Sequence, residues 1–186
     1  MHNFCVVTPG VFWRGAVPGR ADAAWLVEHG VGTVVSLELN VRHAFEGAHI
    51  DPRLAAHTVT YYQVQHFPAI DLLTRHHLDE HVAYVLAIIN EAPKPVFVNC
   101  HEGVDRTGII AAAYRVLVQG RSRGEAIAEM TRFHTPWDPL NARYVRTLSG
   151  ARARKISREM RKWETRLKPT GEFACRDGRC QLESDG

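Results

Sequence analysis

The residues best suited to chemistry lie in one short segment of the chain. Cys100 ends an apolar run, and Arg106 follows after five intervening residues at the start of a second apolar run. Helix N-termini offer unpaired N–H groups and partial positive charge, so a loop bent over one binds anions. Gly103 permits the tight bend, and the guanidinium of Arg106 can hold two phosphate oxygens at once. The segment predicts a phosphate-binding loop between a strand and a helix.

Cys100 is the candidate nucleophile of this loop. The helix dipole, the loop N–H groups and the Arg106 guanidinium all favour the negative charge of a thiolate. A thiolate beside a bound phosphate can attack phosphorus and form a phosphocysteine. Thr107 is expected to hydrogen-bond the sulfur and stabilise it as the leaving group of the second step. The residues expected to surround the phosphate are His101, Glu102, Gly103, Val104, Asp105 and Arg106.

The elements that must position this loop alternate between strands and helices. The expected strands are two within 4–17, around a Pro9-Gly10 turn, and single strands at 33–37, 58–64 and 96–98. The expected helices are 22–29, 78–89, 107–118, 122–133 and 138–167, with 41–57 as a loop that contains a short helix and 65–77 as a loop. This alternation predicts an α/β fold with a central, mostly parallel sheet flanked by helices.

Composition restricts the class of protein. The chain has 186 residues, of which 45% are hydrophobic and 23% charged, which is typical of one globular domain and excludes disordered and fibrous proteins. No apolar run approaches the ~18 residues that span a bilayer. Four cysteines make no disulfide framework, and no secretory signal is visible, so we expect a reducing, cytoplasmic location.

The charge of the chain is concentrated near its C-terminal end. Residues 152–168 carry a net charge of +6, whereas the whole chain carries +3. We expect a basic helix at 151–168, able to make weak contact with an anionic membrane, and a polar, flexible tail at 169–186. Only Trp163 interrupts the basic segment as an aromatic residue, so no specific nucleic-acid binding is expected.

The loop resembles the signature of the cysteine-dependent phosphatases, Cys-x5-Arg-Ser/Thr. Cys100, Gly103, Arg106, Thr107 and Gly108 all match this signature at the family's spacing. The similarity to compact bacterial dual-specificity phosphatases extends over residues 4–148, so a phosphatase domain is expected at 1–150. The resemblance implies hydrolysis of phosphotyrosine, with phosphoserine and phosphothreonine as further substrates, without metal or cofactor.

The resemblance also implies a general acid on a loop roughly thirty residues before the nucleophile, to protonate the departing oxygen. Asp71 lies 29 residues before Cys100 and follows an expected strand, so it is the candidate. Asp79 is the alternative, although it is better placed to start the next helix. Asp138 follows Cys100 and is interpreted as a helix cap.

Other functions stay open. The Asp-Arg-Thr-Gly form of the loop also occurs in relatives that act on inositol phosphates or phosphoinositides. The family usually has His before the nucleophile, whereas this chain has Asn99, which cannot carry positive charge. An inactive phosphate-binding module is therefore a further alternative.

The remaining candidate metal and thiol residues point to no additional site. His76, His77 and His81 lack the accompanying ligands of a zinc site, so no metal is expected. Cys175 and Cys180 lie in the polar tail and are expected to be disordered thiols, with a small redox loop as the alternative.

Overall fold

The computed structural model describes residues 1–37, 41–64, 76–133 and 135–183 of the chain. Within these residues a seven-stranded sheet has the order β1-β2-β5-β3-β4-β6-β7. Its inner strands are parallel: Phe12–Ala16 (β2), Val96–Cys100 (β5), Thr33–Ser36 (β3) and His57–Gln63 (β4). Its outer strands are antiparallel: Cys5–Thr8 (β1), Gly171–Arg176 (β6) and Arg179–Glu183 (β7). The predicted α/β fold with a central parallel sheet is confirmed, with antiparallel strands added at both edges.

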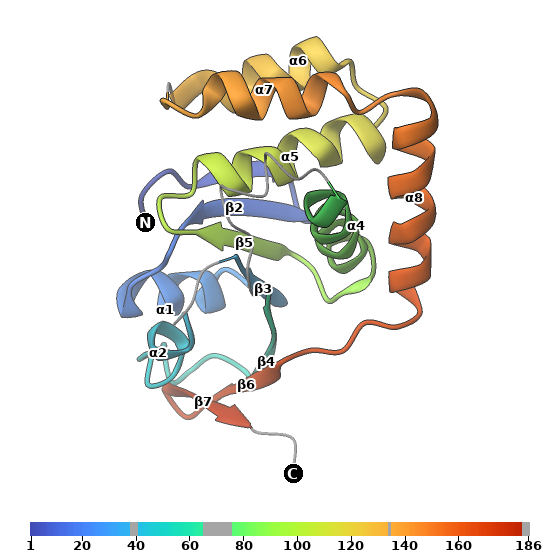
Figure 1. Cartoon of the computed structure of the whole chain (residues 1–186). Coiled ribbons are helices and arrows are strands. Elements are labelled where there is room, and N and C mark those ends of the chain that lie inside the picture. Colours follow the sequence, from blue (N-terminus) through green and yellow to red (C-terminus); the bar gives the residue numbers. More distant parts are fainter. Residues whose placement is uncertain (38–40, 65–75, 134, 184–186) are drawn as a thin grey trace.

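Helices cover both faces of the sheet (Figure 1). One face carries Arg20–Glu28 (α1) and Arg42–Phe45 (α2), and the other carries His76–Glu91 (α4) and Asp105–Leu117 (α5). Arg123–Met130 (α6) and Asp138–Arg146 (α7) form a further layer over α5, and Gly150–Glu164 (α8) packs against α4. Among the described helices, none has the length and apolar character needed to cross a membrane.

The apolar pattern of the sequence explains the central elements. Successive side chains of β5 face opposite sides of the sheet, so Val96, Val98 and Cys100 join the core under α4 and α5. Phe97 faces the second core, under α1 and α2. Helix α5 is buried along most of its length, as its nearly continuous apolar run predicts.

Two helix predictions are refined. The helix expected at 122–133 is α6, which begins with a capping box between Ser122 and Glu125 and is followed by a 3₁₀ turn at Thr131–Phe133. The single helical segment expected at 138–167 is instead two helices, α7 and α8. The chain changes direction before α8, whose first residue, Gly150, has a φ of +52° in the left-handed region that favours glycine.

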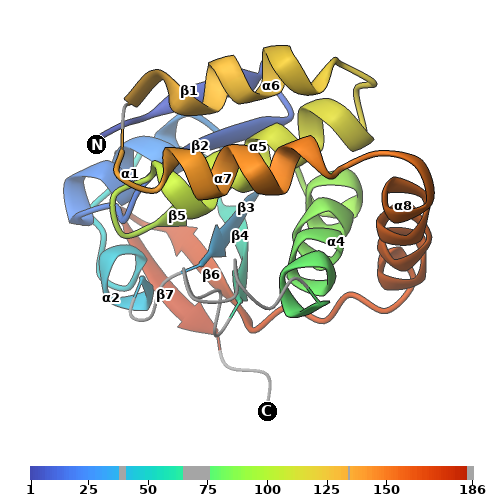
Figure 2. The same ribbon diagram turned by 45° about the horizontal axis from the view of Figure 1, so that its top comes forward.

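The expectation of a flexible tail at 169–186 is wrong for residues 171–183. They form a hairpin, β6–β7, which extends the sheet from β4 (Figure 2). Gly171, Phe173 and Cys175 are the buried alternate residues of β6, and Phe173 and Cys175 join the second core. Cys175 forms a disulfide bond with Cys180 across the hairpin, so the expectation of disordered thiols is wrong. Burial of this alternate face provides the stabilisation that a polar tail would lack.

Candidate active site

Cys100 lies where β5 ends, and α5 begins after a short loop (Figure 1). The strand is held between β2 and β3 in parallel register, and the cysteine side chain is buried. The sulfur lies 3.7 Å from Oγ1 of Thr107, which is also buried, in the first turns of α5. The fold therefore brings together the two side chains that were expected to form a hydrogen bond.

Gly103 sets the path of the loop between Cys100 and α5. Its φ is +73°, and a Cβ atom at this position would lie 2.2 Å from the backbone nitrogen of Ala16 and 2.2 Å from the backbone carbon of Gly15. No side chain fits at such distances, so glycine is required here by close approach as well as by φ. The loop is thereby pressed against the end of β2.

The carbonyl groups of the loop are held from outside it. The N–H of Val17 donates to the carbonyl oxygens of Cys100 (2.9 Å) and His101 (3.3 Å). The side-chain amide of Asn3 donates to the carbonyl oxygen of Glu102 (2.8 Å). In a trans peptide the N–H points opposite to the C=O. The N–H groups of the residues that follow these carbonyls therefore point away from β2 and Asn3, as an anion-binding loop requires.

The first turn of α5 adds further donors. Val104 is the N-cap residue and provides no side-chain hydrogen bond, and the first helical bond runs from the N–H of Gly108 to the carbonyl of Val104 (2.8 Å). The N–H groups that precede Gly108 in this helix have no acceptor within it. Together with the helix dipole, they favour an anion at this end of α5.

Arg106 lies beside the loop and is anchored to the sheet. Its Nη1 donates to the carbonyl oxygen of Leu37 (2.8 Å), just beyond the end of β3, and the residue is half-buried. The guanidinium is thus held at the carboxyl end of the parallel strands, where Cys100 also lies. The loop side chains of His101 and Glu102 are exposed.

Asp105 is directed toward α7. Its Oδ1 accepts hydrogen bonds from Oγ1 of Thr135 (2.6 Å) and from Nδ2 of Asn141 (2.9 Å). Its carboxylate therefore ties the start of α5 to the layer above it. Sequence reasoning placed this acidic residue around the anion without identifying these partners.

Asn99, the residue before the candidate nucleophile, hydrogen-bonds to strand β3. Its Oδ1 accepts from Oγ of Ser36 (3.2 Å), and its Nδ2 donates to the carbonyl of Val35 (3.5 Å), so the side chain links β5 to β3. Since neighbouring strand residues face opposite sides of the sheet, Asn99 lies on the face opposite Cys100.

The two candidate general acids differ in what the structure describes. Asp71 lies outside the described residues. Asp79 lies in the first turn of α4, as its helix-start interpretation predicted. Its carboxylate accepts from Nη2 (2.8 Å) and Nε (3.0 Å) of Arg152 and from the hydroxyl of Tyr144 (3.0 Å). Asp79 thus joins α4 to α7 and α8.

Asp138 has a local role. It is the first residue of α7 rather than its N-cap, which is Trp137. Its carboxylate accepts hydrogen bonds from the N–H (3.1 Å) and the hydroxyl (3.2 Å) of Thr135. It therefore stabilises the turn that enters the helix.

Sequence reasoning missed the position of Arg14 on β2. The residue is 2% exposed, and its Nε and Nη1 have no hydrogen-bond partner among the described residues. Its guanidinium lies over the ring of Phe133 (5.2 Å), and burial lowers its pKa. A Cβ atom on Gly108 would lie 3.4 Å from Nη1 of Arg14 and 3.0 Å from Cγ of Met130, so Gly108 lets α5 pack closely on both.

Within the described part of the chain, no group of three or more His, Cys, Asp or Glu side chains is placed to hold a metal ion. The chemistry available at the site is that of a thiol, a hydroxyl, a guanidinium and backbone donors.

Comparison with known families matches residues 7–145 to the family described as "DSP-PTPase phosphatase fused to NAD+ Kinase" (PTP-NADK). The match includes the whole segment from Cys100 to Gly108 and all four parallel strands.

Two curated proteins are similar to this chain in sequence over part of their length. The dual specificity protein phosphatase TpbA of Pseudomonas aeruginosa is 31% identical over 122 residues, which are 64% of this chain and 50% of TpbA. NAD kinase 2, chloroplastic, of Arabidopsis thaliana is 24% identical over 105 residues, which are 56% of this chain and 10% of that protein. The matched regions span half or less of these relatives.

Solved structures give the same fold. The crystal structure of P. aeruginosa TpbA superposes with a TM-score of 0.59 at 25% identity, covering 86% of this chain and 91% of TpbA. A complex of TpbA with phosphotyrosine superposes with a TM-score of 0.58 at 25% identity, covering 86% and 90%. The catalytic core of the Saccharomyces cerevisiae PP-IP phosphatase SIW14 shares the fold, with a TM-score of 0.57 at 21% identity over 87% of this chain and 93% of that one.

Proposed function

We propose, since the chain belongs to the DSP-PTPase family of cysteine-based dual-specificity phosphatases, that it hydrolyses phosphotyrosine in proteins. The observation that carries the proposal is the contact between the Cys100 sulfur and the Thr107 hydroxyl at the base of the loop. The loop carbonyl oxygens accept hydrogen bonds from Val17 and Asn3, which leaves the loop N–H groups to face an anion. The complex of TpbA with phosphotyrosine supports this substrate. The dual specificity of TpbA supports phosphoserine and phosphothreonine as further substrates.

In the proposed reaction the Cys100 thiolate attacks phosphorus, forming an S–P bond while the P–O bond to the tyrosyl oxygen breaks. The loop N–H groups and Arg106 bind the phosphoryl oxygens as charge develops on them. Water then attacks phosphorus, the S–P bond breaks, and inorganic phosphate leaves. Thr107 stabilises the departing thiolate by donating a hydrogen bond to the sulfur.

Asp71 is the proposed general acid. It would give a proton to the tyrosyl oxygen in the first step and take one from the attacking water in the second. The position of Asp71, 29 residues before Cys100, is the basis of this assignment. The chemistry needs no metal or cofactor. We propose a cytoplasmic location, where the Cys100 thiol stays reduced.

Hydrolysis of a phosphotyrosyl peptide by the wild-type protein and by Cys100→Ser tests the proposal. Cys5→Ser is the matched control, because Cys5 is the other free cysteine among the described residues and lies on β1. We expect vanadate-sensitive, EDTA-insensitive hydrolysis by the wild-type and Cys5→Ser proteins and none by Cys100→Ser. A phosphorylated intermediate trapped by acid quench should map to Cys100.

Phosphoinositides and inositol phosphates are the competing substrates, and they belong in the same assay. Faster turnover of these substrates than of phosphotyrosyl peptides would replace the proposed substrate but keep the mechanism. Phosphate binding without turnover of any of them would contradict the proposed function and identify a binding module.

A further inference from the structure

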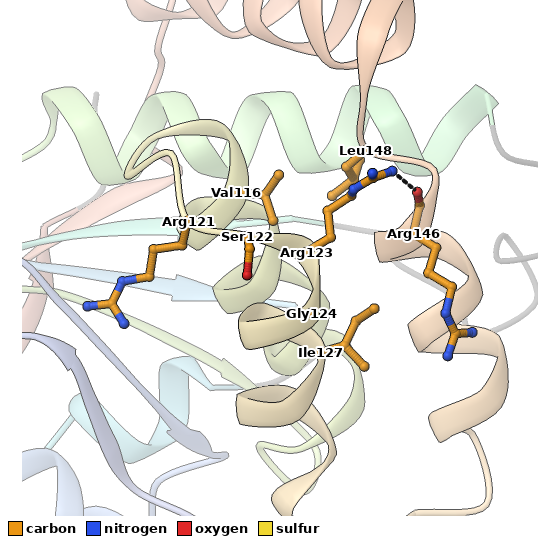
Figure 3. Close-up of a pocket in the computed structure, with 8 residues that line it drawn as sticks. All are labelled: Val116, Arg121, Ser122, Arg123, Gly124, Ile127, Arg146 and Leu148. Atoms are coloured by element: carbon orange, nitrogen blue, oxygen red, sulfur yellow. Dashed lines mark hydrogen bonds between the residues drawn. The ribbon is translucent and has the colours of Figure 1, made fainter.

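Two adjoining hollows lie at the end of α5 that is remote from Cys100. The first has a volume of about 690 Å³ and lies between α5, α6 and the segment that follows α7 (Figure 3). The second, of about 440 Å³, lies between the same end of α5 and α8. Both are lined by Val116 and Leu148, so they lie side by side, and the two hollows together are called the groove. Val116 lies roughly 16 Å along the helix axis from Asp105, at 1.5 Å per residue.

The charged residues at the rim of this groove are all basic. Among the described residues that line the two hollows, six are arginine, and none is acidic or lysine. All six are exposed: Arg121, Arg123, Arg146, Arg154, Arg158 and Arg161. Arginine presents a planar fork that matches a carboxylate, and it sheds water more readily than lysine does.

On helix α8 the groove face carries arginines and no lysine, while Arg152, which pairs with Asp79, does not line the groove. Arg154, Arg158 and Arg161 line the groove, whereas Lys155 and Lys162 do not. Lys162 forms an ion pair with Glu159 on the same helix. The groove face of α8 therefore holds the basic residues best suited to bind carboxylates.

The floor of the groove is aliphatic and lies below the rim. Val116, Leu117 and Ile127 are half-buried, and Leu148 is buried. A membrane-binding face needs apolar side chains that project into the lipid, whereas these lie at the bottom of hollows. Single-stranded nucleic acid is bound by aromatic side chains that stack on bases, and no aromatic residue lines either hollow. The floor instead fits aliphatic side chains inserted from a ligand.

The arginines are spread along the groove rather than gathered around one anion. Figure 3 shows the Arg121 and Arg146 side chains pointing away from the first hollow on opposite sides. Arg123 reaches across it, and its Nη1 donates to the carbonyl oxygen of Arg146 (2.6 Å). Separated cations along an aliphatic floor suit an extended chain with several carboxylates, not a single phosphate.

We propose that this groove is a docking site for an acidic peptide segment of a partner protein, with aliphatic side chains on the floor and carboxylates on the arginine rim. The site is distinct from the phosphate loop, and its occupancy does not depend on the proposed phosphatase activity.

Binding is measured by fluorescence anisotropy with a fluorescein-labelled peptide of repeated Leu-Glu-Glu units. The test variant is Arg158→Ala/Arg161→Ala, and the matched control is Lys155→Ala/Lys162→Ala, which removes the same charge from the same helix. We expect the arginine variant to weaken binding about five- to tenfold and the lysine variant less than about twofold. A peptide with serine in place of leucine should bind about tenfold more weakly, since the floor would then be unfilled.

The proposal would be overturned if the two variants weakened peptide binding equally, or if the serine peptide bound as tightly as the leucine peptide. Either result would mean that the peptide is held by the overall positive charge and not by the groove. Vesicles of phosphatidylcholine with phosphatidylserine form the second arm. Stronger binding to these vesicles than to the peptide, equally reduced by both variants, would replace the docking site with a membrane surface. Because the probe carries no phosphate, a failed phosphatase assay leaves this measurement unaffected.

Discussion

The backbone of Gly103 lies so close to that of Ala16 that a Cβ atom on the glycine would be 2.2 Å from the Ala16 nitrogen. This contact fixes the phosphate loop against the end of β2, while Val17 in the same segment holds two loop carbonyls. The position of the loop thus depends on a strand more than eighty residues earlier in the chain.

Replacement of Gly103 by alanine should displace the loop. We expect Gly103→Ala to lower phosphatase activity by at least about 100-fold, because misplacement of about 1 Å costs that much at a catalytic centre. The matched control is Gly120→Ala, which has a similar φ of +68° but open space around its Cβ. It should lose about 1 kcal/mol of unfolding free energy through φ strain and keep full activity. Equal activity of the two variants would contradict the role of close approach.

Arg106→Lys should impair the enzyme severely. Lysine keeps the charge but cannot hold the Leu37 carbonyl and two phosphate oxygens with one planar group. We expect kcat/KM for a phosphotyrosyl peptide to fall by about 100-fold or more, which corresponds to about 3 kcal/mol of transition-state stabilisation. Arg143→Lys, an exposed substitution on α7, is the control. If the kcat/KM of Arg106→Lys stayed within twofold of that of Arg143→Lys, this would argue against Arg106 as the phosphate ligand.

The two candidate acids should separate in their kinetics. Asp71→Asn should slow hydrolysis of phosphotyrosine by roughly 10²–10⁴-fold, and less for an activated aryl phosphate whose leaving group needs no proton. Asp79→Asn should keep the wild-type rates for both substrates. Instead it should lower the unfolding free energy by about 1–3 kcal/mol, because the guanidinium of Arg152 loses its ionic partner. A leaving-group effect in Asp79→Asn alone would reverse the assignment.

The sequence could predict those parts of the fold whose pattern lies within a few neighbouring residues. Strand β5 and helix α5 are continuous apolar runs, and the capping box of α6 involves residues three apart. The hairpin β6–β7 was missed although Gly171, Phe173 and Cys175 alternate, because its polar residues and short strands resemble a tail. Its stability depends on pairing with β4, more than a hundred residues away, which no local pattern reveals.

At the candidate active site, too, features contiguous in sequence could be predicted and long-range contacts could not. The loop from Cys100 to Thr107 could be recognised because strand, turn and helix start are contiguous in sequence. The partners of Asn99 and Asp105 could not, since Ser36 and Thr135 lie 63 and 30 residues away. Burial of Arg14 also depends on α5 and α6 packing over β2, so only the tertiary structure shows it.

Tyr144 should make the stability of the protein fall in alkaline solution. Burial raises the pKa of its hydroxyl well above 10, and the neighbouring Asp79 carboxylate, which accepts its hydrogen bond, raises it further. The folded state therefore keeps this proton at a pH where the unfolded chain has lost it. The stability linked to the proton is complete below about pH 10 and is lost as the pH rises from there toward the folded-state pKa.

Urea unfolding of the wild-type protein and Tyr144→Phe at pH 8 to 11 measures this contribution. Phenylalanine removes the titrating group, so the decline above about pH 10 should be shallower by up to about 1.4 kcal/mol per pH unit. Loss of the hydrogen bond to Asp79 should cost about 1 kcal/mol below that range, which shifts the curve without changing its slope. Tyr61, whose pKa burial raises to about 12, contributes in the same direction but is present in both proteins, so it cancels from the comparison. Parallel curves for the two proteins above pH 10 would show that Tyr144 ionises as readily in the folded state as in the unfolded chain.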